Sequence, residues 1–274
     1  MRQIYHIANR ELKVGFRNPW AYSFMALFAL FMLCLLLIQA QGYTEGYSGM
    51  TGTMLNLILY LLPLMTLLLG SFSLTAEKEE GSWALLSTYP LSTPAFLAGK
   101  YAGVAIVLLV IVTLGFGITG AAGWLASAGF DFHTYMVLLF FSCSIVLFFL
   151  AIAMLVGTLA RNRWQALTID VAIWFFAIIG WPPLLIAALG FLPYYAIKPA
   201  ISALVFVNPA ELARLFTVIK LGGGSILGPE YYEWVNWIKQ PGGVWGYFLV
   251  SIVWIGALYL LSLLIWQRRR RSHV

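Results

Sequence analysis

Hydrophobic residues in this chain form long runs separated by short polar segments that hold most of the charges. Each run is long enough for one spanning helix, because about 20 apolar residues cross a hydrocarbon core of about 30 Å. The pattern predicts an all-α integral membrane protein in which 1–274 is a single transmembrane domain with six spans. The predicted spans are roughly 20–40, 53–75, 95–126, 134–160, 166–191 and 244–266.

The segment before the first span, 1–19, has a different pattern, in which apolar residues recur at helical spacing with basic residues between them. This pattern is typical of an amphipathic elbow helix at the membrane interface. Pro19 ends the helix, because the residue before a proline disfavours the helical region. The alternative is a frayed basic tail that only sets topology. The apolar positions are Ile4, Ile7, Ala8, Leu12 and Phe16, and the candidate polar residues are Arg10, Glu11, Lys13 and Arg17.

Composition supports the membrane assignment, since 62% of the residues are hydrophobic and 9% are charged, against about a quarter charged in soluble domains. The net charge of +6 does not indicate nucleic-acid binding, because four arginines form the terminal run 268–271. If both termini are cytoplasmic, 12 of the 16 Lys and Arg residues lie inside, as the positive-inside rule requires. We therefore expect a multi-pass protein of a bacterial cytoplasmic (inner) membrane.

Proline and glycine mark two irregular segments in the second half of the chain. Trp181-Pro182-Pro183 interrupts the fifth predicted span, and two missing N–H donors predict either a bent span or a re-entrant piece. The segment 192–243 contains several prolines, among them Pro193, Pro199 and Pro209, together with the glycine triplet 222–224 and apolar stretches too short to span. It predicts an external cap of short helices on or in the outer leaflet.

The sequence contains no pattern typical of catalysis. It has no Walker A motif, no HExxH motif and no catalytic triad or carboxylate pair, so we expect neither an enzyme nor a chain that binds its own cofactor. Cys34 and Cys143 lie in apolar runs and predict packing rather than a metal site or a disulfide. Asp170 is predicted to pair with Arg161 or Arg163, with an intramembrane ion site as the alternative.

The segment 76–94 gathers charge that the rest of the chain lacks, and it is the only sizeable cytoplasmic loop on this topology. We expect a short helix that presents Trp83 and Leu86 at the membrane surface, with Thr93 as N-cap of the next helix. Lys100, about two turns into that helix, is expected to reach back to the lipid headgroups. Such an element can enter a groove of a cytoplasmic partner; the alternative is a solvated turn.

The spacing in this segment resembles the loop after the second span of type-two ATP-binding-cassette permeases. The pattern is Glu77-x-Glu79-x-Gly81-Ser82, then Leu85-Leu86, Tyr89-Pro90-Leu91 and Gly99-Lys100. The resemblance covers the whole chain and implies a second copy and a cytoplasmic ATPase that holds ATP and Mg²⁺. One departure is Ser92-Thr93-Pro94, where family members often carry Arg. The residues that the resemblance assigns to ATPase coupling are Glu77, Glu79, Gly81, Trp83, Leu86, Pro90 and Lys100.

Within this family, three stretches are similar to permease subunits of transporters that mature nitrous oxide reductase. They are "IANRELKVGFRNPW" (7–20), "LLSTYPLSTPAFLAGKYAG" (85–103) and "VNPAELARLF" (207–216). This similarity implies denitrification, a periplasmic β-solenoid protein, a copper chaperone and assembly of a copper–sulfur site, with sulfur, copper or only force crossing the membrane. The alternatives are a drug, lipid or peptide exporter and a non-transporting scaffold. The expected external contacts are Asn208, Pro209, Glu211 and Arg214.

Overall fold

The structure, a computed structural model, describes residues 2–39, 49–81, 92–125 and 131–271, and within these ranges it contains helices and no strands. The predicted all-α class is confirmed for this part of the chain. The helices are α1 (Arg2–Gly15), α2 (Pro19–Gln39), α3 (Gly49–Glu79), α5 (Thr93–Leu125), α6 (Phe132–Leu159), α7 (Arg163–Trp174), the π-helix η1 (Phe175–Gly180), α8 (Trp181–Gly190), α9 (Tyr194–Val207), α10 (Pro209–Lys220), the 3₁₀ turns η2 (Gly223–Leu227) and η3 (Pro229–Tyr231), α11 (Tyr232–Lys239) and α12 (Pro241–Arg271).

Five helical stretches in the described residues are long and apolar enough to cross a membrane. The first predicted span forms α2, whose part Pro19–Cys34 is apolar but shorter than the other five. The pair α9 and α10 is bent by 109° and would supply one further broken span. The fold therefore offers five to six spans, and the crossing by α2 stays a prediction. The five are Thr51–Glu79, Thr93–Leu125, Phe132–Leu159, Arg163–Gly190 and Pro241–Arg268.

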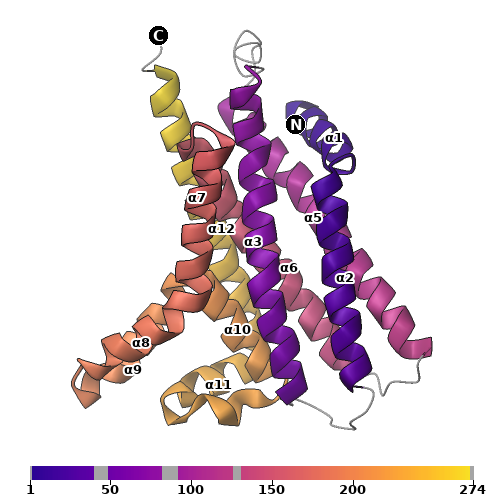
Figure 1. Ribbon diagram of the computed structural model, residues 1–274. Helices are drawn as coiled ribbons and strands as arrows, with labels where there is room; N and C mark the ends of the chain where they lie inside the picture. Colours follow the sequence, from indigo (N-terminus) through magenta and orange to yellow (C-terminus); the bar gives the residue numbers. More distant parts are fainter. Residues whose placement is uncertain (1, 40–48, 82–91, 126–130, 272–274) are drawn as a thin grey trace.

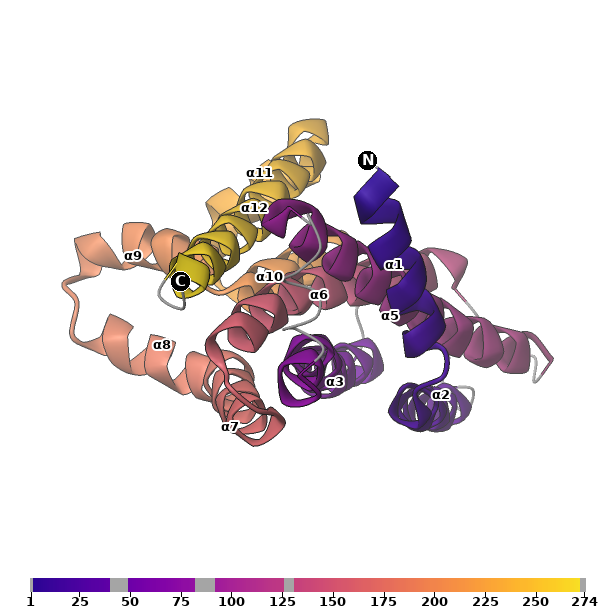
Figure 2. The ribbon, with the colours of Figure 1, turned by 90° about the horizontal axis from the view of Figure 1, so that it is seen from above.

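The long helices run between two ends of the molecule, with α6 in the middle of the bundle (Figures 1 and 2). Helix α6 packs against α3, α5, α10 and α12, and its phenylalanines 141, 148 and 149 are buried there. Helix α1, the last turn of α3, the start of α7 and the end of α12 lie together at one end, which we call the basic end. Helices α8, α9 and α11 lie at the opposite end.

Helix α1 packs along α5, and two glycines make the close approach possible. A Cβ atom on Gly99 would lie 2.8 Å from Ile7 Cβ, and one on Gly103 would lie 2.6 Å from Glu11 Cβ and 2.8 Å from the Ala8 carbonyl oxygen. Small residues at such positions let two helix backbones come together. A helix thus forms before the first predicted span and buries one face on another helix of the bundle, and α2 begins at Pro19. Its role as an elbow at the membrane interface stays a prediction.

The fifth predicted span continues through its two prolines without a break, as α7, the π-helix η1 and α8. Pro182 has no N–H, so the carbonyl of Ala177, five residues earlier, cannot make a π-helical bond to it. Asn208 at the start of α10 supplies the missing donor, with its Nδ2 2.7 Å from the Ala177 oxygen. This contact connects the irregular part of the span to the predicted cap.

The segment predicted as a cap forms short helices, of which α10 is the buried one, and its external position stays a prediction. Ten of the 12 residues of α10 are buried, and the helix packs against α6. Trp234 and Ile238 bury one side of α11, whereas α8 and α9 extend outward from the bundle (Figure 2). The cap is thus anchored in the bundle through α10.

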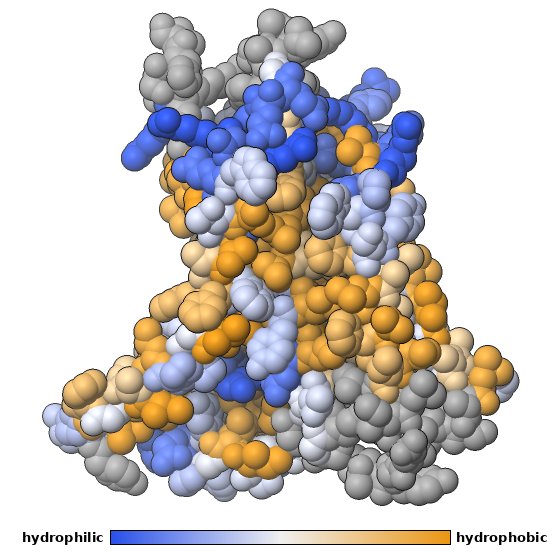
Figure 3. Space-filling model, in the orientation of Figure 1, coloured by the Kyte–Doolittle hydropathy of each residue, from blue (hydrophilic) through white to orange (hydrophobic). Residues whose placement is uncertain are grey.

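Side chains sort by polarity along the bundle, with a hydrophilic band at the basic end above a wide hydrophobic belt (Figure 3). Within their most apolar windows, α3, α5 and α6 each have 56% of residues buried, against 11% for α7–α8 and 6% for α12. The core is therefore built mainly from α3, α5 and α6, and α7–α8 and α12 keep large apolar faces at the surface.

Candidate functional site

The last turn of α3 is the centre of the polar cluster at the basic end. Glu77 and Glu79 lie within α3 rather than in a loop, because the helix continues to Glu79. Gly81 follows with φ of +68°, a left-handed conformation that glycine adopts without strain and that commonly terminates a helix. The predicted loop 76–94 is thus helical at its start and again from Thr93. Three of the predicted coupling residues, Trp83, Leu86 and Pro90, lie outside the described residues.

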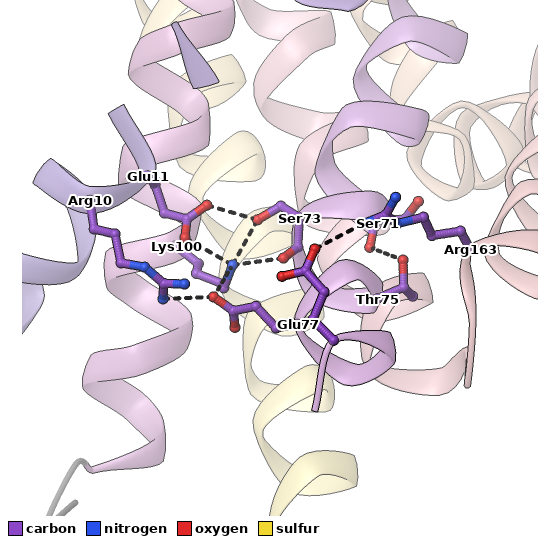
Figure 4. A network of polar contacts seen from close by, with 9 residues as sticks. Arg10, Glu11, Ser71, Ser73, Thr75, Glu77, Lys100 and Arg163 are labelled. Carbon is purple, nitrogen blue, oxygen red and sulfur yellow. Dashed lines mark hydrogen bonds and ion pairs between the residues drawn. The ribbon is translucent and has the colours of Figure 1, made fainter. Parts of the chain in front are cut away.

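Lys100 lies inside the bundle, 1% exposed, where it joins two carboxylates (Figure 4). Its Nζ is 3.0 Å from Glu11 Oε1 of α1 and 3.2 Å from Glu77 Oε1 of α3. The same ammonium donates to the carbonyl and hydroxyl oxygens of Ser73, at 2.8 and 2.9 Å. The expectation that Lys100 reaches the headgroups is therefore wrong, because these acceptors surround the ammonium inside the bundle.

Two further bonds close this network around Lys100. Arg10 Nη1 lies 2.8 Å from Glu77 Oε1, and Ser73 Oγ donates to Glu11 Oε2 at 3.0 Å. Buried charges remain in a folded protein when they are paired and hydrogen-bonded. We call Arg10, Glu11, Ser73, Glu77 and Lys100 the charged joint; it ties together α1, α3 and α5.

Lys78 connects the same turn of α3 to the end of α6. Its ammonium donates to the carbonyl oxygens of Gly157, Thr158 and Ala160, at 2.6, 3.0 and 2.7 Å. The last carbonyls of a helix have no partner within the helix and carry the negative end of its dipole, so a cation there is favourable. The ammonium also lies 5.2 Å from the ring of Trp266 in α12.

Arg163, the first residue of α7, pairs with the two remaining glutamates of the cluster. Its Nε lies 3.2 Å from Glu79 Oε2 and its backbone N–H donates to Glu79 Oε1 at 2.7 Å. Its Nη2 is 3.4 Å from Glu80 Oε1. The side chains of Arg163, Glu79 and Glu80 are 45%, 33% and 65% exposed. The glutamates expected to position an ATPase thus bind groups of their own chain, and only Glu79 and Glu80 also face outward.

Asp170 is fully buried and does not pair with Arg161 or Arg163, so that prediction is wrong. Its Oδ2 accepts a 2.5 Å hydrogen bond from Ser71 of α3, whereas Oδ1 has no hydrogen-bond partner among the described residues. The arginines lie at the start of α7, two turns away, where Glu79 and Glu80 bind Arg163. Asp170 therefore holds α7 against α3 through one neutral donor.

We expect Asp170→Asn to change the free energy of unfolding by less than about 1 kcal/mol, because the amide oxygen still accepts from Ser71. Asp170→Leu removes the acceptor and leaves Ser71 with only a long hydrogen bond, 3.5 Å, to the carbonyl oxygen of Leu68. We expect this variant to lower the free energy of unfolding by about 1–3 kcal/mol. Thermal unfolding of the purified chain in detergent compares the two variants. Equal losses in both would contradict this assignment and show that the negative charge itself is needed.

The expected external contacts do not form an exposed surface in the structure. Asn208, Pro209 and Glu211 are buried, and only Arg214 is partly exposed. Asn208 caps α10 through a 3.0 Å bond to the Ala210 N–H as well as contacting Ala177, and Glu211 holds Arg214 through two hydrogen bonds. Burial, with a smaller contribution from Glu211, raises the pKa of Tyr231 nearby. These residues therefore stabilise the cap internally.

The elbow residues divide between two surroundings. Arg10 and Glu11 belong to the charged joint, whereas Lys13 and Arg17 are exposed. The sequence analysis did not predict the bonds of Ser73 to Lys100, of Lys78 to the end of α6 and of Arg163 to Glu79. Two of these roles had a signal in the sequence, because Lys78 stands among three glutamates and Arg163 follows Arg161 in a short basic stretch between two apolar runs. Ser73 had none, since it is one of many hydroxyl residues in an apolar helix. Within the described ranges, no group of three or more His, Cys, Asp or Glu side chains is placed to hold a metal ion.

Comparison with known proteins bears on what this arrangement is for. Residues 5–271 match the model of the ABC-2 family transporter protein. A relative from Stutzerimonas stutzeri, named probable ABC transporter permease protein NosY, is 27% identical over 278 residues, covering 98% of this chain and 99% of its own. A protein of the same name from Pseudomonas aeruginosa is 27% identical over 284 residues, with the same coverage. Because the family model covers nearly the whole chain, this protein belongs to the ABC-2 family of transporters, as a permease subunit.

Proposed function

We propose that this chain pairs with a second copy and couples cytoplasmic ATP hydrolysis to periplasmic maturation of the copper–sulfur site of nitrous oxide reductase. Hydrolysis is assigned to a separate ATPase chain that binds ATP and Mg²⁺. The family match across residues 5–271 supports the ATPase partner. The names of the two full-length relatives, with the resemblance of 7–20, 85–103 and 207–216, support the nitrous oxide reductase theme.

The observation that carries the proposal is the set of bonds made by the last turn of α3. Four consecutive residues, Glu77 to Glu80, contact α1, α5, α6 and α7. The loop that the resemblance assigns to ATPase contact leaves α3 directly after this turn. A displacement of the turn is therefore passed to four other helices, as a coupling element requires.

The distribution of charge supports the orientation in this proposal. Arg10, Lys13, Lys78 and Arg163 lie at the basic end, with α1 and the end of α12, and cytoplasmic ends of membrane proteins are rich in Lys and Arg. We assign the basic end to the cytoplasm of a bacterial inner membrane, with α8, α9 and α11 on the periplasmic side. The exposed face of α1 then lies at the level of the lipid headgroups.

Affinity purification of the tagged chain from its native membrane tests the proposal. Recovery of an ATPase together with a periplasmic β-solenoid protein is the expected result. An ATPase without the solenoid protein would favour an exporter of a drug, lipid or peptide. Recovery of neither would leave a scaffold and contradict the coupling function.

We expect Trp83→Ala combined with Leu86→Ala to lower recovery of the ATPase at least about tenfold, because losing two apolar anchors of an interface costs more than about 1.4 kcal/mol. Membrane insertion of the chain should not change. The measurement is the ATPase-to-permease ratio after purification in mild detergent.

Trp124→Ala combined with Leu125→Ala is the matched control for this variant. These two exposed side chains end α5 at the opposite end of the molecule, 78% and 76% exposed. The ATPase-to-permease ratio after purification should be the same for this control as for the unchanged chain. Equal losses in both double variants would indicate a general effect of truncating large apolar side chains and would remove the support for the coupling loop.

A further inference from the structure

The ion pairs of the charged joint hold the bundle together, and they also link α1 to the last turn of α3. Resting on the ATPase coupling proposed above, we propose that it makes α1 a moving element of the transporter, with Arg10 and Glu77 as the positioning residues. Displacement of the last turn of α3 is then passed to α1 through Glu77, so that α1 shifts with each nucleotide cycle. A passive membrane anchor would stay in place.

Helix α1 is attached to the rest of the bundle at two levels. Its apolar face packs on α5 at Gly99 and Gly103, without a gap. Its polar residues reach past α5 to α3, where Arg10 contacts Glu77 directly and Glu11 contacts Ser73. Helix α1 therefore cannot keep its position when the last turn of α3 moves, unless these bonds break.

The ion pairs made by the last turn of α3 differ in how deeply they are buried. Lys100 is 1% exposed, and the side chains of Glu11 and Glu77 are 6% and 7% exposed, so removing any one partner leaves a buried charge. The pairs of Arg163 with Glu79 and Glu80 are much more exposed, and exposed ion pairs contribute little. The buried pairs of Glu11 and Glu77 with Lys100 therefore hold α1 to α3 more firmly than the exposed pairs of Arg163 hold α7.

One residue of the charged joint, Arg10, can be changed without leaving an unpaired buried charge. Arg10 is 48% exposed, and Glu77 keeps Lys100 at 3.2 Å when Arg10 is replaced. Arg10→Gln thus removes a direct α1–α3 bond while the buried pairs remain. This variant separates transmission of movement from stability of the fold.

The test uses the complete complex of permease and ATPase in lipid vesicles. A single reporter cysteine, Val14→Cys, is placed on the exposed side of α1, in a chain that also carries Cys34→Ser and Cys143→Ala. Its rate of reaction with a water-soluble maleimide is measured without nucleotide and with ATP and vanadate. We expect the rate to change by about fivefold, which is the lower range for coupled sites.

Arg10→Gln should reduce this nucleotide-dependent change, because the direct ion pair between α1 and α3 is lost while Glu11 keeps its bonds to Ser73 and Lys100. The ATPase should still co-purify and still hydrolyse ATP. Lys13→Gln is the matched control, since Lys13 lies on the same helix, is exposed and makes no ion pair within the described residues. Arg10→Lys retains the positive charge and should restore most of the change.

Two results would overturn the inference: a full nucleotide-dependent change in Arg10→Gln, or none in the unchanged chain while the complex hydrolyses ATP. Both are distinct from failure of the proposed function. That failure would appear earlier, as absence of any co-purifying ATPase.

Discussion

Lys100→Met is expected to lower the free energy of unfolding by about 3–5 kcal/mol, the usual cost when one partner of a buried ion pair is removed. The change leaves Glu11 and Glu77 buried in a bundle that offers them no other fully buried cation among the described contacts. Arg10 can still pair with Glu77, so Glu11 carries most of the loss. Thermal unfolding in detergent, with the monodisperse fraction after purification as a second measure, checks the result.

Lys13→Met is the control for Lys100→Met, because it removes the same charge from an exposed site in α1. It should leave stability within about 0.5 kcal/mol of the unchanged chain. Combining Lys100→Met with Glu11→Gln should restore part of the lost free energy of unfolding, because the unpaired carboxylate of Glu11 is replaced by a neutral amide. If the double variant is no more stable than Lys100→Met alone, packing rather than charge pairing explains the cost.

Gly103→Leu is expected to destabilise the chain by about 1–3 kcal/mol or more, the range for overpacking a tight contact. Its first side-chain atom alone would lie 2.8 Å from the Ala8 carbonyl oxygen and 3.1 Å from Ala8 Cα. Backbone atoms cannot rotate away, so α1 must separate from α5. We expect faster proteolysis of residues 2–15 together with the lower unfolding temperature.

Gly117→Leu is a matched control in the same helix, because nothing lies within 4 Å of a Cβ atom placed there. This substitution should leave both the unfolding temperature and the proteolysis of α1 unchanged. A similar loss in Gly117→Leu would mean that glycine at any position of α5 is needed, for instance for insertion, and would contradict the close-packing explanation.

Periodicity and length were sufficient to predict the helices, since apolar runs of this length have few other solutions in a membrane protein. The amphipathic first helix follows from local spacing, and the irregularity at Pro182 follows from the missing N–H groups. The sequence left open whether the fifth span is bent or re-entrant, and only the structure shows one continuous stretch. Short helices also form in 192–243, because prolines and glycines divide this segment, whereas its position as an external cap stays a prediction.

Partners distant in the chain were not predictable in the same way. Lys100 was expected at the headgroups because a lone lysine near a helix end usually extends there, and only the fold brings Glu11 and Glu77 beside it. Asn208 was expected at an external surface because the stretch 207–216, which the family resemblance includes, falls in the predicted cap. The structure uses it to bind a carbonyl at Ala177, a role created by the proline five residues after Ala177.

The bond from Lys78 to the end of α6 has a consequence for how the chain is made. Its farthest acceptor, the carbonyl of Ala160, lies 82 residues later in the sequence. At about 5–20 residues per second of synthesis, that acceptor emerges roughly 4–16 s after Lys78 itself. During this interval the ammonium needs temporary acceptors, such as lipid phosphates or water at the membrane surface. When the end of α6 is in place, its carbonyl oxygens replace these temporary acceptors of Lys78. Assembly of the polar cluster at the last turn of α3 therefore depends on the order in which the helices insert.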